Sequence, residues 1–124
     1  MRRKILVLAT VGIMIIGQCF SVVAAVPDGF TVSAPSQIYF NRQYIVTGSV
    51  SYTRPSSGGE TTYYLQDKVT VEYKESGYDL TKSKSGYGYN AASATVDGIS
   101  SAPTKKTNTG YYKSGTSFIP IAEK

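Results

Sequence analysis

The feature that most constrains the fold is a regular alternation of apolar and polar side chains in two long segments. From Tyr44 to Tyr52 the even positions are apolar or small and the odd positions are mostly polar, with Ile45 as the exception. Between Thr61 and Lys74 the alternation is as regular, and the apolar residues are Tyr63, Leu65, Val69, Val71 and Tyr73. A period of two places one face of an extended strand on a core and the other in water. Both segments are therefore predicted to be half-buried β-strands.

The segment between them, Arg54–Glu60, contains one proline and two adjacent glycines. Such a composition is typical of a loop that reverses the chain direction. The simplest arrangement is a long antiparallel hairpin, in which Gln43–Thr53 pairs with Thr61–Lys74. Asp67 interrupts the apolar face of the second strand and predicts a bulge or a break into two shorter strands.

The remaining residues contain shorter strand candidates and frequent turn signals. The candidates are Phe30–Ser33, Gln37–Phe40, Tyr87–Val96, Gly110–Lys113 and Thr116–Ile121. Turns are predicted at Ser76-Gly77, Ser85-Gly86, Asp97-Gly98, Asn108–Gly110 and Ser114-Gly115. The polar segment Asp97–Asn108 is predicted to be a long exposed loop. Since no segment after residue 25 shows a sustained helical period with caps, we predict an all-β fold, a small antiparallel β-sandwich or barrel.

The first 25 residues have the layout of a secretory signal peptide. Three basic residues at positions 2–4 precede the almost wholly apolar run Ile5–Ile16, and small residues follow at Val23–Ala25. The apolar run is shorter than the roughly 20 residues that a membrane-spanning helix needs, which favours cleavage over anchoring. We therefore expect a signal peptide at 1–25, whose removal takes the single cysteine with it, and one secreted β domain at 26–124.

The composition of residues 26–124 excludes several classes of function. Three of the 13 basic residues lie in the leader, which leaves 10 basic and 8 acidic residues and a net charge of +2, too little to favour nucleic acid. The segment has no His, no Cys and no Trp. It therefore lacks the ordinary Ser–His and Cys–His nucleophile systems and the usual zinc ligands. We predict a protein that is not an enzyme and that has no cofactor and no metal site.

Two groups of side chains are candidates for contact with a partner. Residues 80–113 carry a net charge of +4, and the lysines concerned are Lys82, Lys84, Lys105, Lys106 and Lys113. Each lysine near an anionic surface contributes about 1 kcal/mol of attraction, which suits a bacterial envelope. The second group consists of Tyr87, Tyr89, Tyr111 and Tyr112, because tyrosine offers a flat apolar ring and a hydroxyl to sugars or proteins. A hydroxyl residue, Gly and Tyr recur in this order at 76–78, 85–87 and 109–111, and we interpret all three as turn-to-strand junctions.

Part of the chain resembles a known family. Tyr89–Val96, a polar loop that contains lysines and then Gly110–Thr116 resemble the middle of the Sec-secreted lactococcin-type bacteriocins, over residues 87–118. The resemblance implies a small β-sandwich with a cleaved signal peptide that acts on the cell envelope of related bacteria. This chain departs from the family in having no Trp, and Ala92 stands where the family often has a His.

Two functions are expected from these features. The first is a secreted antimicrobial or toxin-like protein that acts at the cell envelope of other bacteria. Strands of about 10 residues are long enough to cross a bilayer. The same residues therefore fit either an oligomer of membrane-inserted hairpins or a half-buried hairpin in a sandwich. The alternative is a secreted binding module without lytic activity, such as an adhesin, matrix component or inhibitor, which uses an edge strand or the lysine-rich loop.

Overall fold

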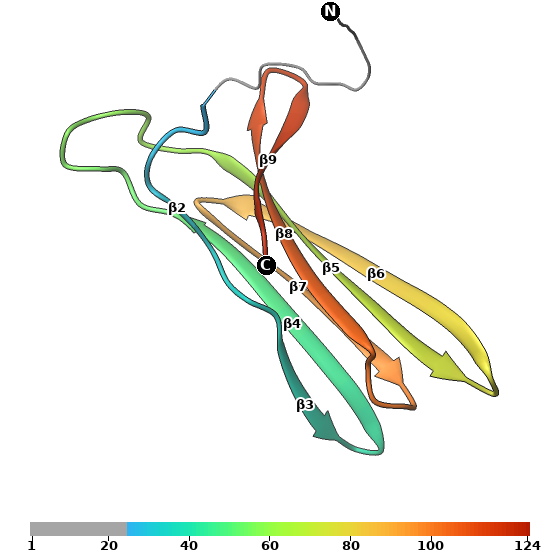
Figure 1. The fold of residues 1–124 in the computed structure, drawn as a ribbon. Coiled ribbons are helices and arrows are strands. Elements are labelled where there is room, and N and C mark those ends of the chain that lie inside the picture. Colours follow the sequence, from blue (N-terminus) through green and yellow to red (C-terminus); the bar gives the residue numbers. More distant parts are fainter. Residues whose placement is uncertain (1–24) are drawn as a thin grey trace, which may run out of the picture.

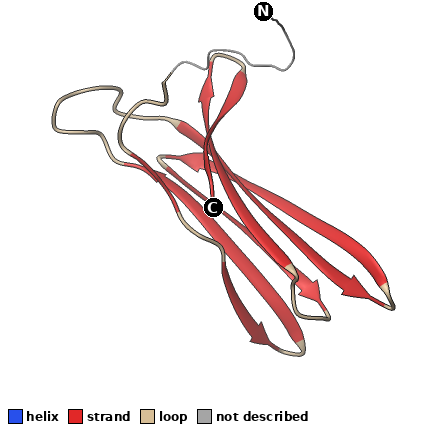
Figure 2. Ribbon diagram, in the orientation of Figure 1, coloured by secondary structure: helices blue, strands red, loops and turns tan. Residues whose placement is uncertain are grey.

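The computed structural model describes residues 25–124, so the predicted signal peptide lies outside the described residues except for Ala25. The described chain is all-β, and its strands form two antiparallel sheets (Figures 1 and 2). The strands are β2 (Phe30–Val32), β3 (Ser36–Phe40), β4 (Gln43–Tyr52), β5 (Tyr64–Glu75), β6 (Tyr78–Tyr89), β7 (Ala91–Ile99), β8 (Lys105–Ser114) and β9 (Ser117–Glu123). Within residues 25–124 no helix has the length and hydropathy that a membrane span requires.

The two sheets differ in how their strands are arranged. In the first sheet β4 is central, β7 pairs along one side, and β2 and β3 pair with opposite ends of the other side. The second sheet has the order β6-β5-β8-β9. The chain passes from the second sheet back to the first at Asn90, whose positive φ of 62° turns β6 into β7. The predicted strand Tyr87–Val96 is therefore wrong as one element, because Asn90 divides it between the two sheets.

The predicted hairpin between 43–53 and 61–74 is also wrong. Both segments are strands, but β4 belongs to the first sheet and β5 to the second, and the connection at 53–63 crosses between them (Figure 1). The physical reason is that each strand has its own apolar face. Placing the two strands in opposite sheets buries both faces against each other, so that Val46 joins a cluster with Val69, and Val50 one with Leu65.

The predicted periodicity is confirmed by the core. The even positions of β4 and the odd positions of β5 point inward, as do Ala92, Ala94 and Val96 of β7. The core divides into two hydrophobic clusters along the strands. Between them on β5 lies Asp67, which follows Leu65 and precedes Val69 on the same face.

Asp67 causes neither of the irregularities predicted for it. Strand β5 pairs without a register shift with both β6 and β8, and Asp67 is fully buried. Its polar neighbour in the core is Asn108 of β8, whose Nδ2 donates to the carbonyl oxygens of Ser33 (2.9 Å) and Ser49 (3.1 Å). A polar layer thus crosses the middle of the sandwich.

Several predicted turns and one predicted loop are strand residues instead. The long exposed loop predicted for Asp97–Asn108 is wrong, because β7 continues to Ile99 and β8 begins at Lys105, which leaves only residues 100–104 between them. The turn at Ser76-Gly77 is confirmed, and the turn predicted at Ser114-Gly115 falls one residue later, at 115–116. Asp97-Gly98 is not a turn, because both residues lie inside β7 at a register shift. Ser85-Gly86 and Asn108–Gly110 lie inside β6 and β8, so only the 76–78 copy of the recurring tripeptide is a turn-to-strand junction.

Candidate functional site

Four aromatic side chains gather on the outer face of the second sheet, and we call them the aromatic platform: Tyr64, Tyr87, Tyr89 and Phe118. Register brings them together, because Tyr64 pairs with Tyr89 and Lys113 pairs with Phe118. The ring centroids of Tyr64 and Tyr89 are 4.8 Å apart, and those of Tyr87 and Phe118 are 5.7 Å apart. Tyr64 connects the set, since its ring is 6.2 Å from that of Tyr87 and 6.1 Å from that of Phe118.

The platform is exposed to an extent that folding does not require. Tyr89 is 71% exposed and Tyr87 is 54% exposed, while Tyr64 and Phe118 are half-buried beside them. The Nζ atom of Lys113 lies 5.8 Å from the centroid of the Tyr64 ring, within the range of a cation–π interaction. Clustered exposed aromatic rings of this kind mark binding surfaces more often than single exposed residues do.

A hollow of about 430 Å³ adjoins the platform, and both Tyr64 and the neighbouring Lys113 line it. Its other polar or aromatic walls include Glu60, Thr62, Tyr63 and Ser114. Burial, together with Tyr52, Glu60 and Tyr112, raises the pKa of the Tyr63 hydroxyl above its ordinary value, so this hydroxyl stays protonated at neutral pH. The hollow therefore combines a neutral phenol with one carboxylate and one ammonium group.

Specific hydrogen bonds hold the loop that supplies Glu60 and Thr62. The Tyr52 hydroxyl donates to the Glu60 carbonyl (2.5 Å), and Arg54 Nε donates to the Gly59 carbonyl (3.0 Å). At the end of the loop, the Tyr63 amide donates to Asn90 Oδ1 (3.0 Å). These bonds fix the walls of the hollow in place before any ligand binds.

The predicted basic face does not form. Lys105 and Lys113 share the outer face of the second sheet but lie near opposite ends of β8. Lys82 and Lys84 occupy the other face of β6, where Lys82 Nζ donates to the Asp97 carbonyl (2.9 Å). Lys106 Nζ donates to Gln37 Oε1 of β3 (3.1 Å). The five lysines therefore do not present one charged patch to an anionic surface.

The predicted tyrosines divide between surface and core. Tyr87 and Tyr89 are in the aromatic platform, and Tyr111 is half-buried on β8. Tyr112 lies in the hydrophobic core and is 8% exposed, and it also lines the hollow of about 430 Å³. The sequence interpretation missed Tyr64 and Phe118 as platform residues. A signal for Tyr64 was present, because this tyrosine stands on the polar face of its alternating strand.

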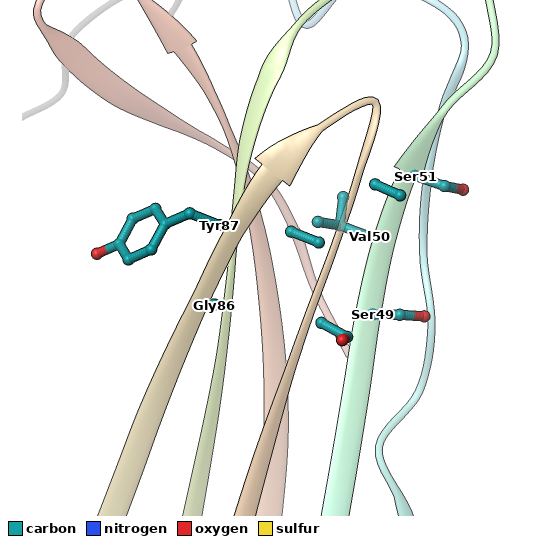
Figure 3. Close-up of a pocket in the computed structure, with 8 residues that line it drawn as sticks. Ser49, Val50, Ser51, Gly86 and Tyr87 are labelled. Carbon is teal, nitrogen blue, oxygen red and sulfur yellow. The ribbon is translucent and has the colours of Figure 1, made fainter.

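A second hollow, of about 510 Å³, lies beside β4, β6 and β7 (Figure 3). Small and hydroxyl side chains line it, including Ser49, Ser51 and Ser93, and the Tyr87 ring points away from the β4 residues. No carboxylate, lysine or arginine is among its lining residues. In residues 25–124, no three His, Cys, Asp or Glu side chains are grouped so that they would hold a metal ion.

Strand β3 forms a second exposed apolar surface. It is an edge strand of the first sheet, and Ile38, Tyr39 and Phe40 are each more than half exposed. The Tyr39 ring packs on Tyr44, with centroids 4.7 Å apart. An exposed edge of this kind offers unpaired main-chain N–H and C=O groups to another strand.

Comparisons of the chain with protein-family models, with curated proteins and with solved structures return no match.

Proposed function

We propose that residues 26–124 act outside the cell as a non-enzymatic binding module that attaches to a macromolecule of a bacterial envelope or cell surface. The observation that carries this proposal is the aromatic platform, in which Tyr87 and Tyr89 extend into solvent on a face that the core does not need. The signal peptide that the sequence predicts at 1–25 supports a location outside the cell. An aromatic surface with an adjoining hollow that contains a few polar groups suits ligand binding.

The structure does not favour a hairpin of residues 43–74 that inserts into a membrane, because β4 and β5 belong to different sheets. The apolar faces of β4 and β5 pack on each other across the core, with Val46, Val50, Leu65, Val69 and Val71 fully or almost fully buried. Exposing them to lipid would require the two sheets to separate. Antimicrobial action at the envelope stays a prediction that rests on the family resemblance, and binding without membrane damage is the function that we propose.

Binding to intact bacterial cells tests the proposal. The double variant Tyr87→Ala/Tyr89→Ala should bind cells at least about tenfold more weakly than the unchanged domain, because two exposed anchors are removed. Tyr78→Ala is the matched control, since Tyr78 is 72% exposed at the other end of β6 and should bind as the unchanged domain does. Unaltered binding by the double variant, or dye release from anionic vesicles, would contradict the proposal.

We also propose that copies of the module associate through strand β3, because it is an exposed edge strand of the first sheet. In the two-residue hairpin of β3 and β4, Ile38 and Phe40 bond to β4, so Gln37 and Tyr39 direct their N–H and C=O groups to the free edge. A two-fold antiparallel contact centred on Ile38 would pair Gln37 of each copy with Tyr39 of the other. Residues 36–40 carry no charge, so this pairing brings no like charges together.

Placing a charge on this edge should separate the copies. Ile38→Lys is expected to shift the sedimentation coefficient at micromolar concentration from dimer to monomer, because lysine on an exposed edge opposes strand pairing. The free energy of unfolding of the monomer should change little, since Ile38 is exposed. Thr47→Lys, a substitution on the neighbouring strand β4, is the control that should leave the dimer intact. A domain that sediments as a monomer without any substitution would contradict the assignment.

A further inference from the structure

We infer that the aromatic platform and its adjoining hollow bind a neutral glycan, an inference that rests on the proposed function and names its ligand class. A pyranose ring has C–H groups on its faces and hydroxyl groups around its edge. The site has the complementary arrangement, with aromatic rings on the sheet and polar groups beside them. The Tyr64 and Tyr87 rings are nearly parallel, with an interplanar angle of 13°. The exposed aromatic rings of Tyr87 and Tyr89 offer apolar faces to sugar rings.

Polar groups border the platform where sugar hydroxyls would lie. Gln66 Nε2 donates to Ser85 Oγ (3.2 Å) on the strands that carry Tyr64 and Tyr87, and this exposed pair follows the platform along the sheet. On the other side, the hollow adds the carboxylate of Glu60 and the ammonium group of Lys113. A carboxylate accepts hydrogen bonds from sugar hydroxyls, and an ammonium group donates them.

The charge of the site favours a neutral ligand. Glu60 and Lys113 cancel, so the hollow has no net charge among the lining residues that the structure gives it. A single-stranded nucleic acid would also stack on aromatic rings, but it needs a positively charged groove along its backbone. The other candidate lysines lie elsewhere, with Lys82 on the opposite face of β6 and Lys105 near the far end of β8. Of the five candidate lysines only Lys113 lies at the platform, and Lys68 pairs with Ser85 farther along the same face of β5. Two cations are too few to follow the backbone of a polyanion.

The test removes sugars or proteins from the surface of the target cells before binding is measured. Periodate cleaves the vicinal diols of sugars, and proteinase K removes surface polypeptides. Binding of the domain should fall at least about tenfold after periodate treatment and should persist after proteinase K. The opposite pattern would overturn the glycan inference while leaving a binding module in place. No binding to untreated cells would overturn the proposed function itself.

Two substitutions of Tyr89 separate the contribution of its ring from that of its hydroxyl group. Tyr89→Phe keeps the ring and should retain binding to untreated cells within about threefold, whereas Tyr89→Ala should lose at least about tenfold. Equal binding by Tyr89→Phe and Tyr89→Ala would show that the ring does not contact the ligand and would overturn the inference.

Glu60→Gln should weaken binding without affecting the melting temperature. The substitution removes the negative charge of an exposed side chain, and the hydrogen bond from Tyr52 is kept because it goes to the main-chain carbonyl of residue 60.

Discussion

Asp67→Asn should raise the free energy of unfolding of the domain at pH 7 by about 2 kcal/mol. Asp67 is fully buried between two hydrophobic clusters, and neither of its carboxyl oxygens has a hydrogen-bond partner. Burial raises the pKa of this carboxyl from 3.8 to about 6, and the contacts with the Asn108 side chain and the Ala94 main chain offset only part of that effect. The shift corresponds to a penalty of about 3 kcal/mol for the ionised form. The asparagine removes the charge and keeps the shape.

The pH dependence of the free energy of unfolding provides a second test of whether the Asp67 charge destabilises the domain. The folded state holds the Asp67 proton up to about pH 6, whereas the unfolded chain releases it near pH 4. The folded state therefore binds more protons between these values, so this group's contribution to stability is complete below about pH 4 and is lost as the pH rises through 6. The proton also supplies a donor beside Asn108, whose Oδ1 has no partner.

Denaturant unfolding at a series of pH values measures both effects. The stability advantage of Asp67→Asn should be small at pH 4 and should grow by about 2 kcal/mol by pH 7, which is roughly 10 °C in melting temperature for a domain of this size. Asp79→Asn is the control, because Asp79 is 83% exposed in its ion pair with Lys74 and its replacement should change little. A loss of stability at pH 7 in Asp67→Asn would show that the buried charge is compensated.

The sequence carries more information about which residues face the core than about which strands are neighbours. Alternation correctly predicted the buried face of β4 and the buried face of β5, because burial of a side chain depends on a period that each strand contains by itself. Pairing is different, since one strand can meet another beside it or across the core with the same residues inside. The connection at 53–63 is long enough for either arrangement, so the hairpin was predicted where the chain crosses between sheets.

Two of the turns predicted from glycine are wrong for a related reason. A glycine in a polar segment is a common signal of a turn, and on that basis Ser85-Gly86 and Asn108–Gly110 were predicted to be turns. In the structure Gly86 and Gly110 lie inside strands, at places where another part of the chain approaches too closely for a side chain. The aromatic platform was partly missed because Phe118 comes from β9 and joins Tyr64 and Tyr87 only through the sheet order.

The second large effect is expected at Gly86, which pairs with Asp67 across β5 and β6. A Cβ atom at Gly86 would overlap with the main-chain carbonyl oxygen of Ser93 in β7. Because the obstacle is backbone rather than a flexible side chain, β7 would have to move away from β6. Gly86→Ala should therefore lower the free energy of unfolding by roughly 3 kcal/mol or more, at the upper end for an overpacked site.

The same substitution should also change the pH dependence of stability, because β7 covers Asp67. The main chain at Ser93 and Ala94 packs over Gly86, and Ala94 contacts the Asp67 carboxyl. If β7 moves away, water reaches the carboxylate and its desolvation decreases, so the loss of stability between pH 4 and pH 7 should be smaller in Gly86→Ala than in the unchanged domain. Lys84→Ala, two residues along the same face of β6, should alter stability by less than about 0.5 kcal/mol. The loss of stability is measured from the denaturant midpoints of the unchanged domain and the two variants at pH 4 and pH 7. If Gly86→Ala is destabilised but its pH dependence is unchanged, the packing of β7 on β6 does not control the burial of Asp67.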